Sequence, residues 1–328
     1  MTASTASGCR TLFVGVVEEG RRCLEAMLEW GERFCGIVTL KEEWARETSG
    51  AVPFDGLAER SSVPLLKVRD LNHPKNVERV RQLDPDLIIV IGWTRLVGRE
   101  ILGIPGLGCI GFHASLLPRY RGRAPVNWAI INGETETGNT MFFLDGGVDT
   151  GDIIAQRRIL IDGEDTCATL YAKVSGSAVE MLHENLPLLK TGKAPRRVQD
   201  HSLATIMPKR RPEDGVIDWK KDAAALDRWV RALTHPYPGA FTGAPSGRLF
   251  AWKAAPTHVV GGVAPGTILD CEGESVLVAA GNGSLRLISV QAEGEVEAPA
   301  AEVAARHGWK PGFRFLSPIT ESGKAEAM

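Results

Sequence analysis

The sequence predicts an α/β protein in which a doubly wound, mostly parallel sheet is followed by a small β-barrel. Up to about residue 205, apolar strand-like runs alternate with segments whose apolar residues recur at helical spacing, as in βαβ units. Beyond that point, short strand-like runs are separated by Gly- and Pro-rich turns, which is typical of a small barrel. We therefore expect one domain over 1–205, a β-rich domain over 206–316 and a disordered tail over 317–328.

Each element of the first domain is predicted by a local pattern. Runs of apolar and β-branched residues predict strands over 11–17, 34–40, 64–68, 86–93, 108–112, 139–144 and 153–161. Apolar residues at helical spacing predict helices over 23–30, 74–83, 125–132 and 166–189. The clearest strand is 86–93, a continuous apolar run of the kind that is buried on both faces of a parallel sheet.

The second domain begins after a polar, Pro-containing segment, 208–214, which is typical of a linker. Helical spacing predicts a helix over 222–234. Short strands are predicted over 249–253, 258–261, 266–270, 275–279 and 284–290. Short strands in a region rich in Gly and Pro favour a barrel.

The composition limits the classes of protein to which the chain can belong. Of its 328 residues, 44% are hydrophobic and 24% are charged, which suits a globular protein of two domains. The six cysteines form no CxxC pair, so we expect neither a metal site nor a disulfide scaffold. No apolar run can span a membrane and the N-terminus does not resemble a signal peptide, so we expect a cytoplasmic location. The net charge of −2 argues against a large nucleic-acid surface.

The turn after the first predicted strand lacks a nucleotide-binding motif. A dinucleotide or P-loop fingerprint needs glycines where this chain has Val16, Val17 and Glu18. The sequence therefore disfavours a nicotinamide enzyme or a P-loop NTPase.

The segment 111–152 contains the residues best suited to catalysis. His113 stands just past a predicted buried strand, at the carboxyl edge where open α/β sheets bind ligands. Asp149 lies in a Gly-rich turn between two later strands. If both reach the same edge, the carboxylate orients the imidazole and favours its protonated form, as in an acid–base pair. The spacing alone does not distinguish this pair from a structural histidine and a turn-forming aspartate.

This segment resembles the folate-dependent formyltransferases, whose pattern is N-x-H-x-S-L-L-P, a Gly/Arg-rich turn and D-x-G-x-D-x-G. The residues that match the pattern are His113, Ser115, Leu116, Leu117, Pro118, Tyr120, Arg121, Gly122, Asp145, Gly147, Asp149 and Gly151. Weaker similarity runs from about residue 11 to 315, and 217–241 resembles the start of the family's second domain. The resemblance implies a Rossmann-like catalytic domain over 1–205, an OB-like barrel, and His113 and Asp149 as catalytic residues.

By the same resemblance, the one-carbon donor is 10-formyltetrahydrofolate. The residues expected to contact this donor are Gly92, Trp93, Thr94, Arg95, Leu96, Val97, Asp145, Gly146, Gly147 and Val148. Members of the family contact the pteridine there mostly with backbone groups. The residues expected to contact the acceptor are Ser115, Leu116, Arg121 and Asn127.

One catalytic position departs from the family pattern, because the Asn that precedes the His by two residues is Gly111 here. In formyl transfer the Asn amide and the His stabilise a developing oxyanion, and losing one such donor costs roughly 3–4 kcal/mol of barrier. A water above Gly111 or the amide of Asn127 can replace the missing group. The alternatives are transfer of a formimidoyl group, which needs no oxyanion hole, or a homologue that only binds or hydrolyses folate.

The acceptor is expected to be a small-molecule amine, either in a nucleotide-linked amino sugar or in an amino-acid-like or hydroxylamino precursor. The segment 41–60 has nearly balanced charge, whereas the tRNA-directed members of the family carry basic loops. The pattern at 120–138 and the PGAF motif at 238–241 also favour sugar-modifying members. Methionyl-tRNA is the alternative acceptor, so a nucleic-acid partner is less favoured and no membrane partner is expected.

Two further points stay open at the level of sequence. The basic patch Lys209-Arg210-Arg211 is interpreted as a solvated linker, with a phosphate contact as the alternative. The oligomeric state is not predicted, and a homodimer is one alternative.

Overall fold

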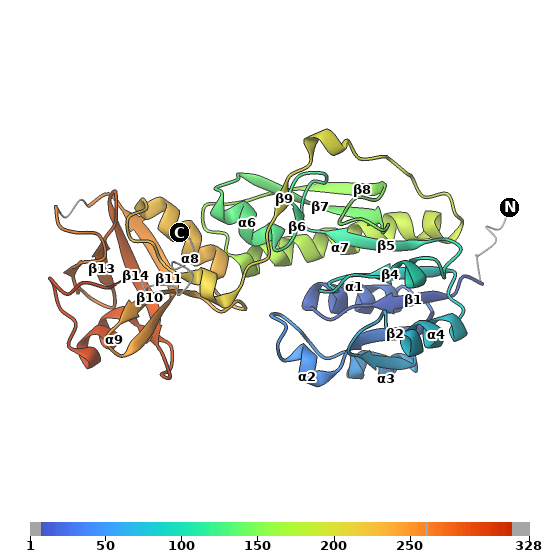
Figure 1. Ribbon diagram of the computed structural model, residues 1–328, viewed down its shortest axis with the longest axis horizontal. Coiled ribbons are helices and arrows are strands. Elements are labelled where there is room, and N and C mark those ends of the chain that lie inside the picture. The colour runs from blue at the N-terminus through green and yellow to red at the C-terminus, as the bar shows by residue number, and fades with distance from the viewer. Residues whose placement is uncertain (1–7, 260–261, 317–328) are drawn as a thin grey trace, which may run out of the picture. The chain divides into compact units, whose positions relative to one another are not determined.

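The structure, a computed structural model, describes residues 8–259 and 262–316, which pack into two compact units (Figure 1). The first unit contains residues 8–125, 136–160 and 171–208. The second contains residues 126–135, 161–170 and the described residues from 209 onward. Because two short segments group with the later part of the chain, the division does not follow a single point in the sequence. The expected tail, 317–328, lies outside the described residues.

The first unit is built on a seven-stranded sheet. The strand order is β3 (Leu65–Val68), β2 (Phe34–Leu40), β1 (Thr11–Val14), β4 (Leu87–Val90), β5 (Cys109–His113), β7 (Glu136–Phe143) and β8 (Ile153–Leu160). The strands from β3 to β5 pair in parallel, whereas β5, β7 and β8 pair antiparallel. The predicted doubly wound, mostly parallel sheet is confirmed, and its β8 side is antiparallel.

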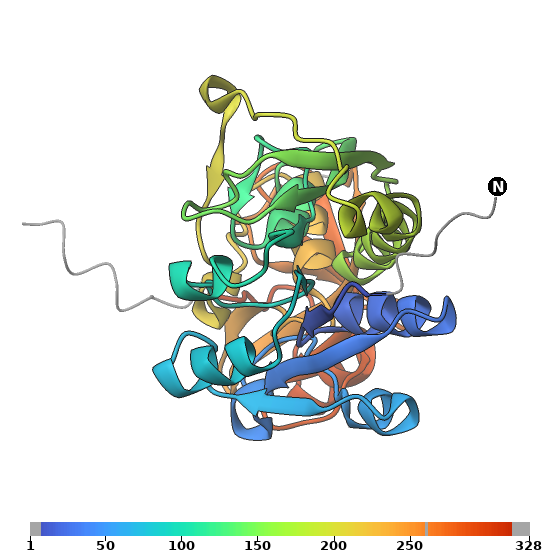
Figure 2. The ribbon, with the colours of Figure 1, turned by 90° about the vertical axis from the view of Figure 1, so that its right-hand side faces the viewer.

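Helices cover both faces of this sheet, as Figure 2 shows. The helices are α1 (Glu18–Glu29), α2 (Glu42–Ala45), α3 (Asp55–Ser61), α4 (Pro74–Gln82), α5 (Arg99–Leu102) and most of α7 (Cys167–Lys190). One apolar layer joins α1, α3 and α7 to side chains such as Phe13 and Ile89, and the other joins α4 and α5 to side chains such as Leu12 and Ile88. Alternate residues of a strand point to opposite faces, which is why the continuous apolar run of β4 supplies both layers.

The strand order reverses at β1, so the turns that follow β1 and β4 face each other at the carboxyl edge of the sheet. Open α/β sheets bind ligands at such a switch point. The two turns are in close contact. A Cβ on Gly20 would lie 2.5 Å from the carbonyl oxygen of Ile91, and one on Gly92 would lie 2.4 Å from the side chain of Val17. The two glycines therefore let the segment after β4 leave the sheet directly against the start of α1.

The second unit is an antiparallel sheet that closes on itself. Its strand order is β10 (Ala240–Ala244), β11 (Gly247–Thr257), β14 (Ser284–Ala292), β13 (Val276–Ala279) and β12 (Ile268–Asp270), with β15 (Ala298–Pro299) paired to β14. Residues 313–316 bond to both edges, since Phe315 pairs with Gly266 beside β12 and Leu316 pairs with Gly243 in β10. This closing segment produces the small barrel that the sequence predicts.

The remaining elements are short. They are α6 (Pro125–Ile131), α8 (Ala223–Leu233), α9 (Ala300–His307), and β6 (Arg121–Gly122), which pairs with β9 (Ile206–Met207). The strand expected at 258–261 is not formed at 258–259, because β11 already ends at Thr257, and residues 260–261 lie outside the described residues. The sequence does not predict α9, a short helix whose N-cap residue is Pro299 and offers no capping side chain.

Among the described residues, no helix is both long enough and apolar enough to cross a membrane.

Candidate active site

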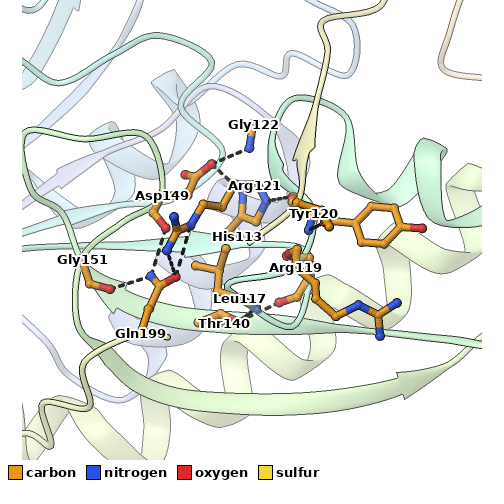
Figure 3. A network of polar contacts seen from close by, with 12 residues as sticks. His113, Leu117, Arg119, Tyr120, Arg121, Gly122, Thr140, Asp149, Gly151 and Gln199 are labelled. Carbon is orange, nitrogen blue, oxygen red and sulfur yellow. Dashed lines mark hydrogen bonds and ion pairs between the residues drawn. The ribbon is translucent and has the colours of Figure 1, made fainter. Parts of the chain in front are cut away.

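His113 and Asp149 lie close together in the first unit, as Figure 3 shows. His113 is the last residue of β5. The backbone N–H of Leu144 donates to the carbonyl oxygen of Cys109, at the opposite end of β5 from His113. The turn 145–152, which follows Leu144, therefore folds back along β5 before Asp149 reaches the imidazole. The Nδ1 atom of His113 lies 3.7 Å from Oδ2 of Asp149. The structure thus brings the expected pair together, although the turn starts from the amino end of β5.

The His113 imidazole is oriented by one short hydrogen bond. Its Nε2 atom lies 2.6 Å from the backbone carbonyl oxygen of Tyr120. A carbonyl oxygen can only accept, so Nε2 carries a proton and Nδ1 is the ring nitrogen that faces Asp149. The histidine is buried, whereas the Asp149 side chain is 20% exposed. Proton exchange with a ligand is therefore expected on the Nδ1 side of the ring.

Asp149 is held in a left-handed backbone conformation, with a φ of 54°. This conformation costs a non-glycine residue roughly 1–2 kcal/mol. Two hydrogen bonds hold it: Oδ2 accepts from the backbone N–H of Gly122 at 2.8 Å, and the carbonyl oxygen accepts from Nε2 of Gln199 at 3.0 Å. The same Oδ2 atom faces His113, so the backbone of the turn after Tyr120 directs the carboxylate toward the imidazole.

Arg121 and Gln199 form a buried support for the Asp149 turn (Figure 3). Arg121 donates to Oε1 of Gln199 from Nε at 3.3 Å and from Nη2 at 2.6 Å. Gln199 in turn donates from Nε2 to the carbonyl oxygens of Asp149 and Gly151, at 3.0 and 2.7 Å. Arg121 is only 6% exposed. Its guanidinium therefore supports the turn that carries Asp149 through Gln199, whereas the resemblance implies a contact with the acceptor.

Sequence reasoning missed Gln199. The residue lies in a segment without a motif, and a single glutamine carries no pattern of its own. The small β6–β9 sheet brings this segment to the site, helped by the hydrogen bond from the Arg121 backbone N–H to the carbonyl oxygen of Thr205 at 2.8 Å. Only the tertiary pairing reveals its role.

The other residues expected to contact the acceptor have partners within the protein. Ser115 donates from Oγ to the carbonyl oxygen of Arg119 at 2.7 Å, and Leu116 lies partly buried against β7. Asn127 belongs to the second unit, where its Nδ2 donates to the carbonyl oxygen of Ala232 at 2.6 Å. The Asn127 amide is therefore committed to α8, and the expectation that it replaces the missing Asn is not supported.

The space above Gly111 is filled by Leu144. A Cβ at position 111 would lie 2.7 Å from Cδ2 and 3.3 Å from Cγ of Leu144. An apolar side chain thus stands where a substitute water was expected, so that expectation is wrong. An Asn at this position would fit only if Leu144 moved.

The two segments expected to contact the donor each expose an apolar side chain. Leu96 is 66% exposed and Val148 is 51% exposed, which suits contact with a flat ring. Asn72 holds the loop after β4, because Nδ2 donates to the Leu96 carbonyl oxygen at 2.9 Å and Oδ1 accepts from the Gly98 N–H at 2.6 Å. Within this loop, the indole Nε1 of Trp93 is buried and has no hydrogen-bond partner among the described residues.

Asp145 shapes the start of the Gly-rich turn. Its Oδ1 atom accepts from the backbone N–H of Gly147 at 3.0 Å and from Oγ1 of Thr150 at 2.6 Å. The loop after β4 is bonded to the segment after Tyr120, because Arg123 donates from Nη1 to the carbonyl oxygen of Thr94 at 2.6 Å. The preceding residue, Gly122, donates its backbone N–H to Asp149. Both segments are therefore preorganised by side chains of the first unit.

The basic patch at 209–211 is in part structural. The Arg210 guanidinium lies 5.0 Å from the ring centroid of Trp128 and 4.6 Å from that of Trp229. It also donates to the carbonyl oxygen of Asp214 at 2.9 Å, and burial lowers the pKa of Arg210. This residue packs within the second unit, so the interpretation of the patch as a solvated linker is wrong for Arg210.

Comparison with known proteins identifies the family. Residues 31–186 match the formyl transferase model, and residues 209–308 match the model of the formyl transferase C-terminal domain. A methionyl-tRNA formyltransferase of Geobacter sulfurreducens is 37% identical over 322 residues, which cover 98% of this chain and 99% of the relative.

Two solved structures share the fold. The N-formyltransferase from Helicobacter canadensis, in complex with folinic acid and dTDP-3-aminofucose, has a TM-score of 0.66 at 17% identity and covers 85% of this chain and 98% of that chain. HypX from Aquifex aeolicus, in complex with tetrahydrofolic acid, has a TM-score of 0.63 at 22% identity and covers 90% of this chain and 47% of that chain. This chain therefore spans about half the length of HypX.

These findings correct the expected acceptor. A relative that aligns with this chain over nearly the full length of both proteins is a methionyl-tRNA formyltransferase, whereas the sugar-linked match shares 17% identity and shows the fold alone. The predictions of a small-molecule acceptor and of a less favoured nucleic-acid partner are therefore wrong. The family predicted from the motifs at 111–152 is confirmed. With both family models matched in order and 37% identity over nearly its whole length, the chain belongs to the formyl transferase family.

Proposed function

We propose that this protein transfers the formyl group of 10-formyltetrahydrofolate to the amino group of methionyl-tRNA. The observation that carries the proposal is the 37% identity to a methionyl-tRNA formyltransferase over 98% of this chain and 99% of the relative. Similarity of this extent includes the catalytic segment and the C-terminal domain, so it bears on the acceptor as well as on the chemistry.

The residues of the two donor segments fit the folate. Leu96 and Val148 offer exposed apolar surface to a flat ring, and the buried Trp93 indole N–H, which lacks an acceptor among the described residues, can donate to a polar edge. The loop is held by Asn72 and the turn by Asp145 through hydrogen bonds within the protein. When bound, 10-formyltetrahydrofolate supplies a formyl carbon that an amine can attack.

The geometry of the His113–Asp149 pair suits proton transfer to and from that amine. Their facing atoms are 3.7 Å apart, longer than a direct hydrogen bond of about 3.2 Å or less, yet a nitrogen beside the pair can contact both atoms. Asp149 accepts the proton that the attacking nitrogen loses, directly or through water. His113 acts as an acid toward the developing oxygen or the leaving nitrogen.

The surrounding bonds limit how the pair can move. The Tyr120 carbonyl oxygen fixes the ring through Nε2, and the Gly122 N–H fixes the carboxylate through Oδ2. Because residue 111 is a glycine and Leu144 covers it, this position offers no side-chain amide to stabilise the oxyanion. His113 therefore carries a larger share of that stabilisation than in members of the family that have Asn there.

The test is a direct assay of the parent protein with 10-formyltetrahydrofolate and methionyl-tRNA, in which formyl-methionine released from the tRNA is measured by mass spectrometry. His113→Ala and Asp149→Asn should each lower turnover by about a hundredfold, as expected for the loss of acid–base help. His183→Ala, which removes an exposed histidine of α7, is the matched control and should retain activity. Circular dichroism should show that all three variants are folded.

The outcomes test the identity of the acceptor and the roles of the two residues separately. Release of tetrahydrofolate at the same rate with and without methionyl-tRNA would indicate hydrolysis and would overturn the proposed function. Full activity of His113→Ala would refute the assigned chemistry while leaving methionyl-tRNA as the acceptor.

A further inference from the structure

Two arginines converge on one tryptophan in the first unit. The guanidinium carbon of Arg69 lies 4.4 Å from the ring centroid of Trp44, and that of Arg95 lies 5.5 Å from the same centroid. Both distances are within the roughly 6 Å range of cation–π contacts. Trp44 belongs to α2, which follows β2, whereas Arg69 follows β3 and Arg95 follows β4. Since these strands are parallel, the three side chains meet at the carboxyl edge of the sheet.

Arg69 and Arg95 have no ion-pair partner in the part of the chain that the structure describes. Among the described residues, neither guanidinium forms a hydrogen bond or has a carboxylate oxygen within 4.0 Å. Three nearby acidic groups have other partners: Glu42 and Asp55 pair with Lys67, and Asp70 accepts from the backbone N–H of Asn72. The arginine pair is therefore a local positive site on a chain whose net charge is −2.

The role of Trp44 indicates the chemistry of the ligand. A guanidinium that stacks on an aromatic ring keeps its in-plane N–H groups free, and this fork matches two oxygens of a phosphate. A ring covered by a guanidinium does not offer that face for stacking with a nucleobase. The arrangement therefore favours contact with the backbone of a nucleic acid over contact with its bases.

We propose that Arg69 and Arg95, held by Trp44, bind a backbone phosphate of the acceptor RNA. This site rests on the proposed tRNA acceptor, and it is connected to the reacting pair. Arg95 follows Thr94, whose carbonyl oxygen accepts from Arg123, and the residue before Arg123 donates its backbone N–H to the catalytic carboxylate. A phosphate bound by Arg69 and Arg95 would hold the RNA beside the loop after β4, which is linked to Asp149 by these hydrogen bonds.

The first experiment measures how fluorescently labelled methionyl-tRNA binds to the full chain at several salt concentrations. Arg69→Gln should weaken binding about five- to tenfold and should reduce the slope of log affinity against log salt by about one, as for one lost phosphate contact. Arg79→Gln removes an exposed arginine of α4 that makes no contact with Trp44, and it should change neither quantity. Trp44→Leu keeps the net charge, so a loss of affinity in this variant shows that the ring positions the fork.

A second experiment separates RNA phosphate from the carboxylates of a folate tail. Protection against thermal unfolding by pentaglutamyl tetrahydrofolate should be the same for Arg69→Gln and for the parent. Loss of folate protection with unchanged RNA binding would overturn the assignment to phosphate. If the parent formylates methionyl-tRNA and Arg69→Gln binds it as tightly as the parent does, the phosphate site is refuted and the proposed function stands. If the parent binds the tRNA without formylating it, the proposed function fails, and the salt slopes still decide the phosphate site.

Discussion

Glu19 should make the stability of this protein depend on pH. It lies in the first turn of α1, and its Oε1 atom is buried without a hydrogen-bond partner among the described residues. Burial raises the pKa of the Glu19 carboxyl from its ordinary value of 4.5 to about 7, and a contact with the Asn139 side chain opposes this only in part. The Oδ1 atom of Asn139 is also buried and unpartnered, while its Nδ2 already donates to Val174 and Ser177. A protonated Glu19 supplies the donor that this cluster lacks.

The magnitude follows from the two pKa values. A tenfold change in an ionisation constant corresponds to about 1.4 kcal/mol, so the interval from 4.5 to about 7 corresponds to about 3.5 kcal/mol. The helix dipole favours a negative charge in the first turn by only about 0.3–1 kcal/mol, so the effect of burial is larger. Between pH 4.5 and about 7 the folded state retains a proton that the unfolded state loses, so the free energy of unfolding falls as pH rises. Below and above this window the contribution is constant.

Glu19→Gln isolates this contribution, because glutamine is neutral at every pH and carries its own donor. Urea denaturation of the parent and the variant between pH 4.5 and 8 should give nearly equal stabilities at the acid end. At pH 8 the variant should be more stable by up to about 3.5 kcal/mol. Glu29→Gln, at an exposed position of the same helix, is the control. A stability difference between Glu19→Gln and the parent that does not change with pH would refute the reasoning.

Two further predictions concern the support of the site. Gln199→Ala should lower stability by about 1–3 kcal/mol, because it removes the main acceptor of the buried Arg121. Gln199→Glu keeps that acceptor but not the donors to the Asp149 turn, so urea denaturation should show recovered stability while turnover stays low. Gly111→Asn should lower stability by about 1–3 kcal/mol, because the new side chain meets Leu144, and it should not raise turnover. Adding Leu144→Ala to Gly111→Asn should relieve the clash and raise turnover above that of Gly111→Asn alone. A Gly111→Asn variant that is as stable as the parent and turns over faster would contradict this packing argument.

The fold was predictable where local pattern and final environment agree. β4 is a continuous apolar run because both of its faces are buried, and α7 repeats its apolar residues with helical spacing along its length. The direction of β7 and β8 was not predictable, because an apolar strand looks the same in a parallel and an antiparallel pair. That direction has a consequence for the site: the turn 145–152 starts at the amino end of β5 and must fold back to deliver Asp149 to His113.

The candidate site shows the same limit. His113 and Asp149 could be predicted as site residues, because each lies in a short motif that can be recognised in the sequence alone. The contact between Gly111 and Leu144 could not be predicted from the sequence. The two residues meet only because β5 pairs with β7 and Leu144 directly follows β7. A missing Asn amide therefore suggested empty space, whereas the folded chain fills that space with an apolar side chain. Gln199 was hidden for the same reason.

The acceptor was misjudged because net charge is a poor measure of a local site. At physiological ionic strength, charges separated by more than about 8 Å are largely screened, so a phosphate senses the few side chains near it and not the sum over the surface. The nearly balanced segment 41–60 illustrates the point. Two of its acidic residues, Glu42 and Asp55, are paired with Lys67. Trp44 in the same segment contacts Arg69 and Arg95, and no carboxylate of the described residues lies within ion-pair distance of either arginine. A chain with a net charge of −2 can therefore hold a local positive site at the carboxyl edge of its sheet, so its net charge alone does not argue against an RNA acceptor.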